Sequence, residues 1–268
     1  MTPARLARVM VEGVPVVAGQ ATAEPWWSET LRLFKESVGH RDYPCHFGRL
    51  ALTRGELYAA FCDQDTASLA DRLSWFLDMS RVHPERRLVL AAFCKSGAIP
   101  GSESDYGEMF WRILQGLHDA DTEDWPAGIP RDPEDSAWEF SFHGVPMFVF
   151  AAAPSYARRA SRNVGPGLVL LFQPRNVFDG IEGGTPRGIA ARQIIRTRLS
   201  QWDTVPPHLD LGDYGDPSNH EWRQYFIPDD QSRLHEKCPL QIRGADSAHP
   251  GEEPRDGKEG KDGHDDGH

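Results

Sequence analysis

Residues 138–151 have the pattern of a β-hairpin, and this segment limits the possible folds more than any other. Residues 138–142 read Trp-Glu-Phe-Ser-Phe and alternate strictly between apolar and polar side chains, as a strand does. His143 and Gly144 then suit a tight two-residue turn. Residues 145–151 are apolar and are predicted to return beside the first strand. The sequence therefore predicts that antiparallel pairing contributes much of the sheet.

Other segments divide into blocks of predicted strands and blocks of predicted helices. Helices are predicted at residues 25–38, 66–83, 103–117 and 189–202, from apolar residues at helical spacing. Strands are predicted at residues 14–18, 50–53, 57–61, 88–93 and 168–172, with a turn at Arg54 and Gly55 that would make 50–61 a second hairpin. Because the strands are expected to form hairpins, we predict an α+β fold: one domain with an antiparallel-rich mixed sheet flanked by helices.

The charge and cysteine content narrow the class of protein. The 268 residues carry a net charge of −11, which argues against a nucleic-acid partner because phosphate binding needs a basic face. No apolar run approaches the roughly 20 residues of a membrane span, and no export signal is evident. The four cysteines are far apart in the sequence and indicate neither a zinc ribbon nor a disulfide framework. We therefore expect a cytoplasmic protein whose thiols are free.

The ends of the chain differ in composition from its middle. Residues 1–23 have no clear period and are predicted to be a loosely ordered lead-in, with a short extended piece at Val14–Ala18. Residues 244–268 contain no large apolar side chain, and acids outnumber bases by five, so we predict a disordered acidic tail. The intervening residues 24–243 are predicted to form the functional domain.

Residues 192–225 are the richest in chemically useful side chains. The predicted helix must stop before Pro206 and Pro207, because proline lacks an N–H group and clashes with the preceding turn. Beyond the prolines, acids, histidines and an arginine alternate with aromatic residues. Such a mixture on a non-helical segment is typical of a pocket wall, although a packed surface loop would have the same composition.

Several side chains are candidates for binding or catalysis, each with a plainer structural alternative. His208 follows two stiff prolines and suits a metal or haem axial ligand, although the residues by themselves favour an ordinary surface histidine. The arginines near residue 160, together with Arg196, suit ligand carboxylates. Cys45 and Tyr156 are alternative metal ligands, through a thiolate or through a phenolate whose pKa nearby arginines would lower. The candidate arginines are Arg158, Arg162 and Arg196, and the candidate acids for a cationic substrate are Asp213 and Glu221.

Short blocks of sequence, in a fixed order, resemble a known family. The blocks are Tyr-Pro-Cys at 43–45, Ser-Arg-Asn at 161–163, Gln-Pro-Arg-Asn-Val-Phe at 173–178, Ile-Arg-Thr-Arg at 195–198, His208, Tyr-Gly at 214–215, Glu-Trp-Arg-Gln-Tyr at 221–225 and Cys-Pro at 238–239. Together they resemble the YqcI/YcgG family over roughly residues 25 to 242, with the block at 221–225 the most specific. Many relatives have a histidine after the second hairpin strand, where this chain has Tyr156.

The resemblance implies a haem-dependent enzyme that hydroxylates nitrogen. It implies a haem b monooxygenase that converts L-arginine to Nω-hydroxy-L-arginine in D-cycloserine-type antibiotic biosynthesis, using O2 with an external electron donor, or peroxide. His208 would ligate iron, ahead of Tyr156 and Cys45. The implied catalytic residues are Tyr214, Arg223 and Tyr225. Two alternatives stay open: N-oxygenation of another amine or guanidine, and a non-enzymatic haem- or ligand-binding module. A homodimer is compatible with either.

Overall fold

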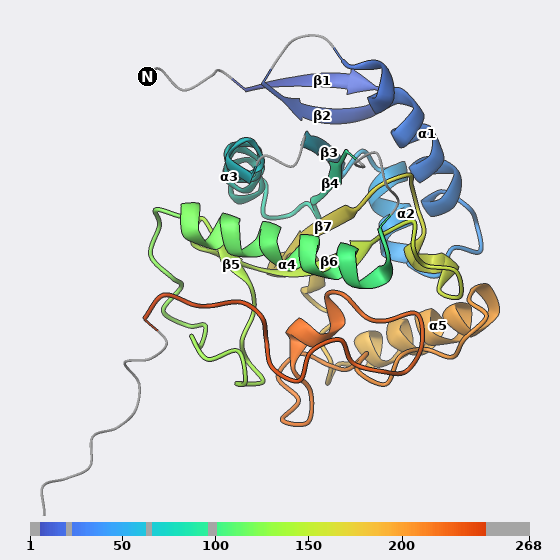
Figure 1. Ribbon diagram of the computed structural model, residues 1–268, viewed down its shortest axis with the longest axis vertical. Coiled ribbons are helices and arrows are strands. Elements are labelled where there is room, and N and C mark those ends of the chain that lie inside the picture. The colour runs from blue at the N-terminus through green and yellow to red at the C-terminus, as the bar shows by residue number, and fades with distance from the viewer. Residues whose placement is uncertain (1–5, 20–22, 63–65, 96–100, 245–268) are drawn as a thin grey trace, which may run out of the picture.

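The computed structural model describes residues 6–19, 23–62, 66–95 and 101–244, and it contains one mixed sheet flanked by helices (Figure 1). The sheet has the strand order β1-β2-β3-β4-β7-β6-β5. The strands are β1 Ala7–Val11, β2 Val14–Ala18, β3 Leu57–Cys62, β4 Val89–Cys94, β5 Ser141–Phe142, β6 Val145–Ala152 and β7 Val169–Pro174. The helices are α1 Pro25–Val38, α2 His46–Thr53, α3 Thr66–Val82, α4 Glu103–Ala120 and α5 Pro186–Trp202, with 3-10 turns η1 Ala160–Arg162, η2 Arg175–Phe178 and η3 Glu221–Gln224. The predicted α+β class is confirmed.

Antiparallel pairing dominates among the strands that the structure describes. β2 with β3 and β3 with β4 are parallel, whereas the other neighbouring strands run antiparallel. The hairpin predicted from the alternating segment is present as β5 and β6. Its turn residues His143 and Gly144 have φ values of 53° and 66°, the positive values that a two-residue turn of this hand requires.

The two faces of the sheet build two separate hydrophobic cores. Alternate residues such as Tyr58 and Leu90 pack under α3 and α4, whereas their neighbours Ala59 and Val89 pack under α1 and α2. On β6 and β7, Phe150 and Leu171 of the α1–α2 side are only half-buried, whereas Val149 and Phe172 of the opposite side are fully buried. Helices α1 and α2 therefore leave part of this face uncovered, and α5 closes over the open space.

The segment predicted as a strand at residues 50–53 is instead helix α2. Leu50 and Leu52 alternate too briefly to impose an extended chain, and the Cys45 side chain caps the helix by accepting a hydrogen bond from the Gly48 N–H. The predicted hairpin at residues 50–61 is therefore wrong. The strand expected at residues 57–61 does exist as β3, but it pairs in parallel with β2 and β4.

The extended piece expected at Val14–Ala18 is strand β2, and every one of its residues is buried. It forms a hairpin with β1 through Glu12 and Gly13, whose φ values are 51° and 76°. Ordered strands thus begin at Ala7, inside the segment expected to be a loose lead-in, because these short apolar strands extend the main sheet. The predicted acidic tail lies beyond Gly244, outside the described residues.

Helix α5 has the predicted position but not the predicted buried face. Thr185 caps its start through the Gly188 N–H at 3.0 Å, and Trp202 ends it before the two prolines. Ile189 and Ile194, two of the apolar residues whose helical spacing predicted this helix, are 55% and 53% exposed. The side of α5 that faces the sheet lines a cavity instead of a packed core, so the apolar side chains of this helix are less buried than its pattern predicts.

No helix in the described part of the chain has the length and apolar character to cross a membrane.

Candidate functional site

A cavity of about 890 Å³ lies between α5 and the uncovered face of the sheet. Its volume is within the roughly 300–1,000 Å³ of typical ligand sites. The floor comes from β4, β6 and β7, and the walls come from α1, α2, α5 and the segment around residue 212. Apolar residues that line it include Val38, Phe47, Leu50, Phe148, Phe150, Leu171, Phe178, Ile195 and Leu199. The cavity can therefore hold a large, mostly apolar ligand.

Cys45 lies in the wall of this cavity at the first turn of α2. Its Sγ accepts a hydrogen bond from the Gly48 N–H at 3.3 Å. Burial raises the pKa of the Cys45 thiol, and the backbone N–H groups of Phe47 and Gly48 oppose that rise. On balance burial favours the neutral thiol, so Cys45 would bind a metal as a thiolate only where the metal displaced its proton. Among the described residues, no three His, Cys, Asp or Glu side chains gather closely enough to hold a metal ion by themselves.

A buried charged cluster forms another part of the cavity wall. An Arg175 terminal nitrogen lies 2.6 Å from Glu139 Oε1 and 2.7 Å from Glu221 Oε2. Glu221 also accepts a hydrogen bond from the Tyr225 hydroxyl at 3.0 Å. The Arg175 guanidinium stacks 3.9 Å from the ring centre of Tyr214. Two carboxylates therefore share one internal cation, so the ionised cluster is one negative charge in excess.

Burial disfavours that excess charge. Burial raises the pKa of Glu221 to about 8, although the nearby Arg175 opposes the rise. The pKa of Glu139 is raised for the same reason. Glu139 Oε2 is also buried without a hydrogen-bond partner among the described residues. At neutral pH the Glu139–Glu221 pair can therefore either keep a proton or bind an external cation instead of that proton.

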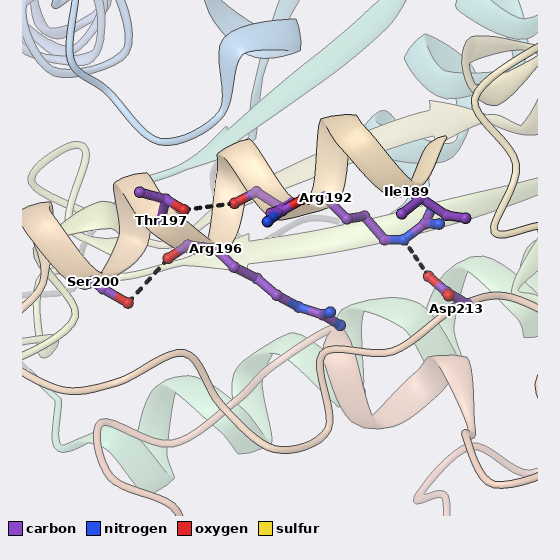
Figure 2. Close-up of a pocket in the computed structure, with 7 residues that line it drawn as sticks. Ile189, Arg192, Arg196, Thr197, Ser200 and Asp213 are labelled. Atoms are coloured by element: carbon purple, nitrogen blue, oxygen red, sulfur yellow. Dashed lines mark hydrogen bonds and ion pairs between the residues drawn. The ribbon is translucent and has the colours of Figure 1, made fainter. Parts of the chain in front are cut away.

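Two arginines of α5, Arg192 and Arg196, line the cavity and also a smaller groove beside it. The groove has a volume of about 470 Å³, and Figure 2 shows Arg192 and Arg196 reaching from α5 toward the segment that carries Asp213. Arg192 Nε lies 2.5 Å from Asp213 Oδ1. Arg196 donates to the Leu211 carbonyl at 2.6 Å. Asp213 is thus paired with an internal cation. Arg54, which is exposed and also lines the cavity, has no ion-pair partner among the described residues.

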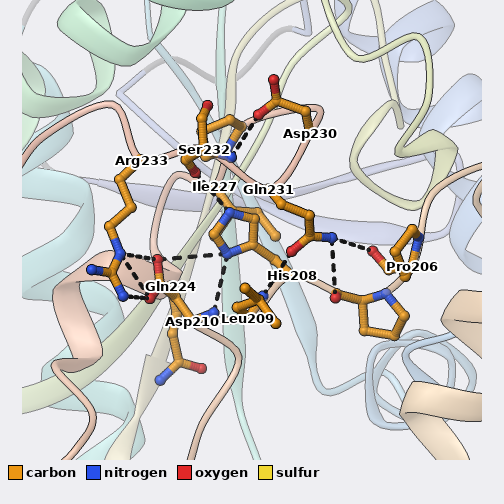
Figure 3. Close-up of polar contacts among 12 residues, drawn as sticks. Pro206, His208, Leu209, Asp210, Gln224, Ile227, Asp230, Gln231, Ser232 and Arg233 are labelled. Atoms are coloured by element: carbon orange, nitrogen blue, oxygen red, sulfur yellow. Dashed lines mark hydrogen bonds and ion pairs between the residues drawn. The ribbon is translucent and has the colours of Figure 1, made fainter.

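His208 is buried in a polar cluster and does not line the cavity (Figure 3). Its Nδ1 accepts from the Asp210 N–H at 3.1 Å, and its Nε2 lies 2.9 Å from the Ser232 carbonyl. Both ring nitrogens are therefore occupied, with the proton on Nε2. Burial lowers the pKa of His208, which keeps the ring neutral. This geometry favours a structural role over the metal-ligand role expected from the sequence.

Tyr156 and the arginines near residue 160 also hold the chain together. Tyr156 donates to the Ile227 carbonyl at 2.6 Å, and burial raises its pKa, contrary to the lowering expected from the nearby arginines. The Arg162 guanidinium touches the cavity but donates to carbonyls of Ala151, Tyr225 and Gln224. Arg158 is exposed and lies outside the lining.

Among the candidate residues of the 221–225 block, Glu221 lines the cavity and Tyr225 supports it from behind. Glu221 lines the cavity, together with Tyr214 from the preceding segment. Tyr225 is fully buried behind Glu221, and it also accepts from the Phe140 N–H at 3.1 Å. Arg223 packs over the Trp222 ring and lies outside the lining.

Four cavity-region residues were missed as candidates from the sequence: Arg54, Glu139, Arg175 and Arg192. Glu139 stands between two large aromatic residues in the hairpin pattern, and a carboxylate bracketed in this way was the available signal. Arg175 belongs to the Gln-Pro-Arg-Asn-Val-Phe block. Nothing in the pattern distinguished Arg54 and Arg192 from ordinary surface arginines.

Three known proteins are similar to this chain over most of their length. The YcgG protein of Bacillus subtilis is 35% identical over 224 residues, 80% of this chain and 88% of its own length. The YqcI protein of the same organism is 34% identical over 228 residues, which cover 82% of this chain and 89% of the YqcI protein. A Streptomyces lavendulae protein, provisionally named N(omega)-hydroxy-L-arginine synthase DcsA, is 31% identical over 232 residues, which cover 82% of this chain and 86% of the relative. No solved structure matches the chain significantly. The model of the YqcI/YcgG family matches residues 34–241, and the chain belongs to this family.

Proposed function

We propose that this protein is a haem-dependent monooxygenase that hydroxylates a guanidino nitrogen of L-arginine. One observation carries the proposal: the same apolar cavity is lined by a helix-capping cysteine, Cys45, and by Glu221, one carboxylate of a buried pair. The provisional name of the Streptomyces relative, an N(omega)-hydroxy-L-arginine synthase, supports the choice of arginine.

The residues present fit a haem. Cys45 is the side chain that would hold the haem iron, in place of His208 and Tyr156, because Cys45 borders the cavity and the ring nitrogens of His208 already have partners. Phe150, Leu171 and the other apolar lining residues suit the flat faces of a macrocycle. The guanidinium group of Arg196 at the rim, which donates to the Leu211 carbonyl and forms no ion pair among the described residues, suits a propionate. Haem ligated by a thiolate would supply the activation of oxygen.

The carboxylate cluster suits the substrate guanidinium. Glu221 presents a carboxylate to the cavity, and the excess negative charge that it shares with Glu139 favours a cation. Charge-assisted hydrogen bonds of this kind contribute roughly 1.5–3 kcal/mol each. Tyr225 holds Glu221 in position from behind, and Tyr214 offers an aromatic face to a planar cation. Asp213, already paired with Arg192, is assigned a supporting role at the rim.

The proposed reaction consumes one O2, two electrons and two protons, and it gives Nω-hydroxy-L-arginine and water. With peroxide as oxidant, the two electrons and the two protons are already contained in the reagent. The chain's own residues bind and orient the guanidinium, and Glu221 can accept a proton from it. The apolar walls exclude bulk water from the nitrogen that reacts.

The test is an absorption spectrum of protein purified after expression with a haem precursor. A Soret band, and its shift on addition of arginine, are the expected results. Cys45→Ala should remove the band or change its position, whereas His208→Ala should leave the position unchanged. Turnover of arginine to hydroxyarginine should exceed turnover of lysine, which has similar length but no guanidinium. A colourless protein would refute the proposal, and a Soret band without turnover would reduce it to a haem-binding module.

A further inference from the structure

A cluster of positive charge lies at the junction of α2 and α5, on the Cys45 side of the cavity. It consists of His46, Arg49 and Arg54 from α2 and its C-terminal end, together with Arg198 from α5, and we call it the α2–α5 basic surface. His46 and Arg49 lie in α2, and Arg54 caps the end of this helix. Arg198 reaches from α5 to the Tyr43 carbonyl, two residues before Cys45 at the start of α2.

The charges of the α2–α5 basic surface are not neutralised within the protein. Among the residues that the structure describes, no carboxylate forms an ion pair with Arg49, Arg54 or Arg198. His46 Nδ1 and Arg49 Nε are also buried without a hydrogen-bond partner in this part of the chain. Unpaired cations in a chain of net charge −11 indicate a surface that is completed by something anionic.

The position of the surface is as informative as its charge. His46 directly follows Cys45 in the sequence, and the Arg49 N–H donates to the Cys45 carbonyl at 3.2 Å. Arg198 reaches across from α5 to the Tyr43 carbonyl at 3.4 Å, which joins α5 to the segment that leads into α2. Ile194 lies one helical turn before Arg198 and is 53% exposed. An apolar contact beside a basic one is the usual composition of a protein–protein interface.

We propose that the α2–α5 basic surface is the docking site of a small acidic one-electron carrier protein. This inference rests on the proposed function, which requires two electrons for each O2, and no sequence motif for flavin or iron–sulfur binding is present to supply them. Transient electron-transfer complexes have small interfaces and depend on opposite charges to bring the partners together. The carrier would bind over the first turn of α2, next to the cysteine that we assign as ligand.

Other anionic occupants fit less well. The substrate is itself a cation in its side chain, so this surface would repel the part that the cavity recognises. A nucleic acid would extend past the small basic surface and meet the negative charge of the remaining chain. A compact acidic protein can contact the basic surface alone, and its own negative charge explains why the arginines have no internal partner.

The experiment compares a double variant with a matched control. Arg49→Glu with Arg198→Glu reverses two charges of the surface, and neither residue lines the cavity. Arg8→Glu with Arg112→Glu makes the same change in net charge at exposed positions on β1 and α4, away from the cavity. The probe is a plant-type [2Fe–2S] ferredoxin, a low-potential acidic carrier. Binding is measured by calorimetry, and haem reduction is measured by stopped-flow absorption, both over a range of salt concentrations.

We expect binding of ferredoxin to the unaltered protein to weaken steeply with salt, because exposed charges are screened. Arg49→Glu with Arg198→Glu should weaken binding about tenfold or more at low salt, slow the reduction by ferredoxin in parallel and abolish most of the salt dependence. The milder Arg49→Gln with Arg198→Gln should have a smaller effect of the same sign. The control variant should bind like the unaltered protein, and dithionite should reduce all of them at equal rates.

Unchanged ferredoxin binding in Arg49→Glu with Arg198→Glu would overturn the docking site. So would a change in oligomeric state with ferredoxin binding intact, since the surface would then be a contact between copies. These outcomes differ from a failure of the proposed function, because they concern a protein whose Soret band is present. If the protein has no Soret band, the proposed function and the electron-transfer role fail together.

Discussion

The guanidinium of Arg175 lies 2.7 Å from the carboxylate of Glu221 in the wall of a largely apolar cavity. The same guanidinium also serves Glu139, so that a single cation balances two buried acids. The protein therefore keeps a guanidinium–carboxylate contact of its own at the place where we propose that a substrate guanidinium binds. This arrangement links the stability of the fold to the binding of a cation.

Replacement of Arg175 by methionine should strongly destabilise the fold. It would leave two buried carboxylates without their common partner, and loss of one member of a buried pair costs about 3–5 kcal/mol. Urea denaturation at neutral pH measures the loss. Adding Glu139→Gln and Glu221→Gln to the same protein should recover much of it, because neutral side chains no longer need the cation. If Arg175→Met alone is as stable as the parent, the cluster does not carry the charge that we assign.

Arginine binding should strengthen as pH rises. Burial raises the pKa of Glu221 from its ordinary value of 4.5 to about 8. In the ligand-free protein this carboxyl group therefore loses its proton only as the pH approaches 8. A cation binds the ionised form, and affinity should therefore increase between these two values. Without ligand the sign is opposite: the stability contributed by this group is complete below pH 4.5 and is lost as pH rises toward 8.

Titration of the arginine-induced spectral change at several pH values tests this expectation. Glu221→Gln should bind arginine at least about tenfold more weakly and should lose most of the pH dependence. Glu108→Gln, on the exposed side of α4, is the matched control and should behave like the parent. An affinity that falls with pH across this window would contradict the proposed role of Glu221.

His208→Ala should lower stability without removing the cofactor. The change deletes an acceptor for the Asp210 N–H and a donor to the Ser232 carbonyl, and buried groups left unpaired cost about 1–3 kcal/mol each. Because burial lowers the pKa of His208, the stability contributed by its neutral form should decline as pH falls below 6.5. Guanidinium chloride denaturation at pH 7.5 and 5.5 measures both effects. Loss of the Soret band in a folded variant would restore His208 as the ligand.

Gly188→Ala should disturb the cavity through the start of α5. A Cβ atom at this position would lie 2.1 Å from the Glu182 carbonyl oxygen and 2.4 Å from that of Ile181. The backbone must shift to relieve this clash, and α5 forms a cavity wall. We expect weaker haem retention, measured by transfer of haem to apomyoglobin. Gly184→Ala is the matched control, since nothing lies within 4 Å of its added methyl group, and equal retention in both variants would contradict the expectation.

Part of the candidate site was accessible from the sequence because it depends on local pattern. The Glu-Trp-Arg-Gln-Tyr block pointed to Glu221, and Glu221 does line the cavity. Cys45 was also a candidate, although it ranked third as an iron ligand. His208 ranked first because two prolines fix its backbone, yet a fixed backbone does not determine what surrounds a side chain. Its partners Asp210 and Ser232 became visible only in the folded chain.

The sequence by itself determined the β5–β6 hairpin, the positions of the long helices and the family, because alternation, helical spacing and short residue blocks are properties of neighbouring positions. Only the tertiary structure decided that residues 46–53 form a helix rather than a strand, and that α5 covers a cavity with Ile189 and Ile194 exposed. It also brought Glu139 and Arg175 to Glu221 from distant segments. Contacts between distant segments depend on how the sheet and helices pack, and no local pattern contains that information.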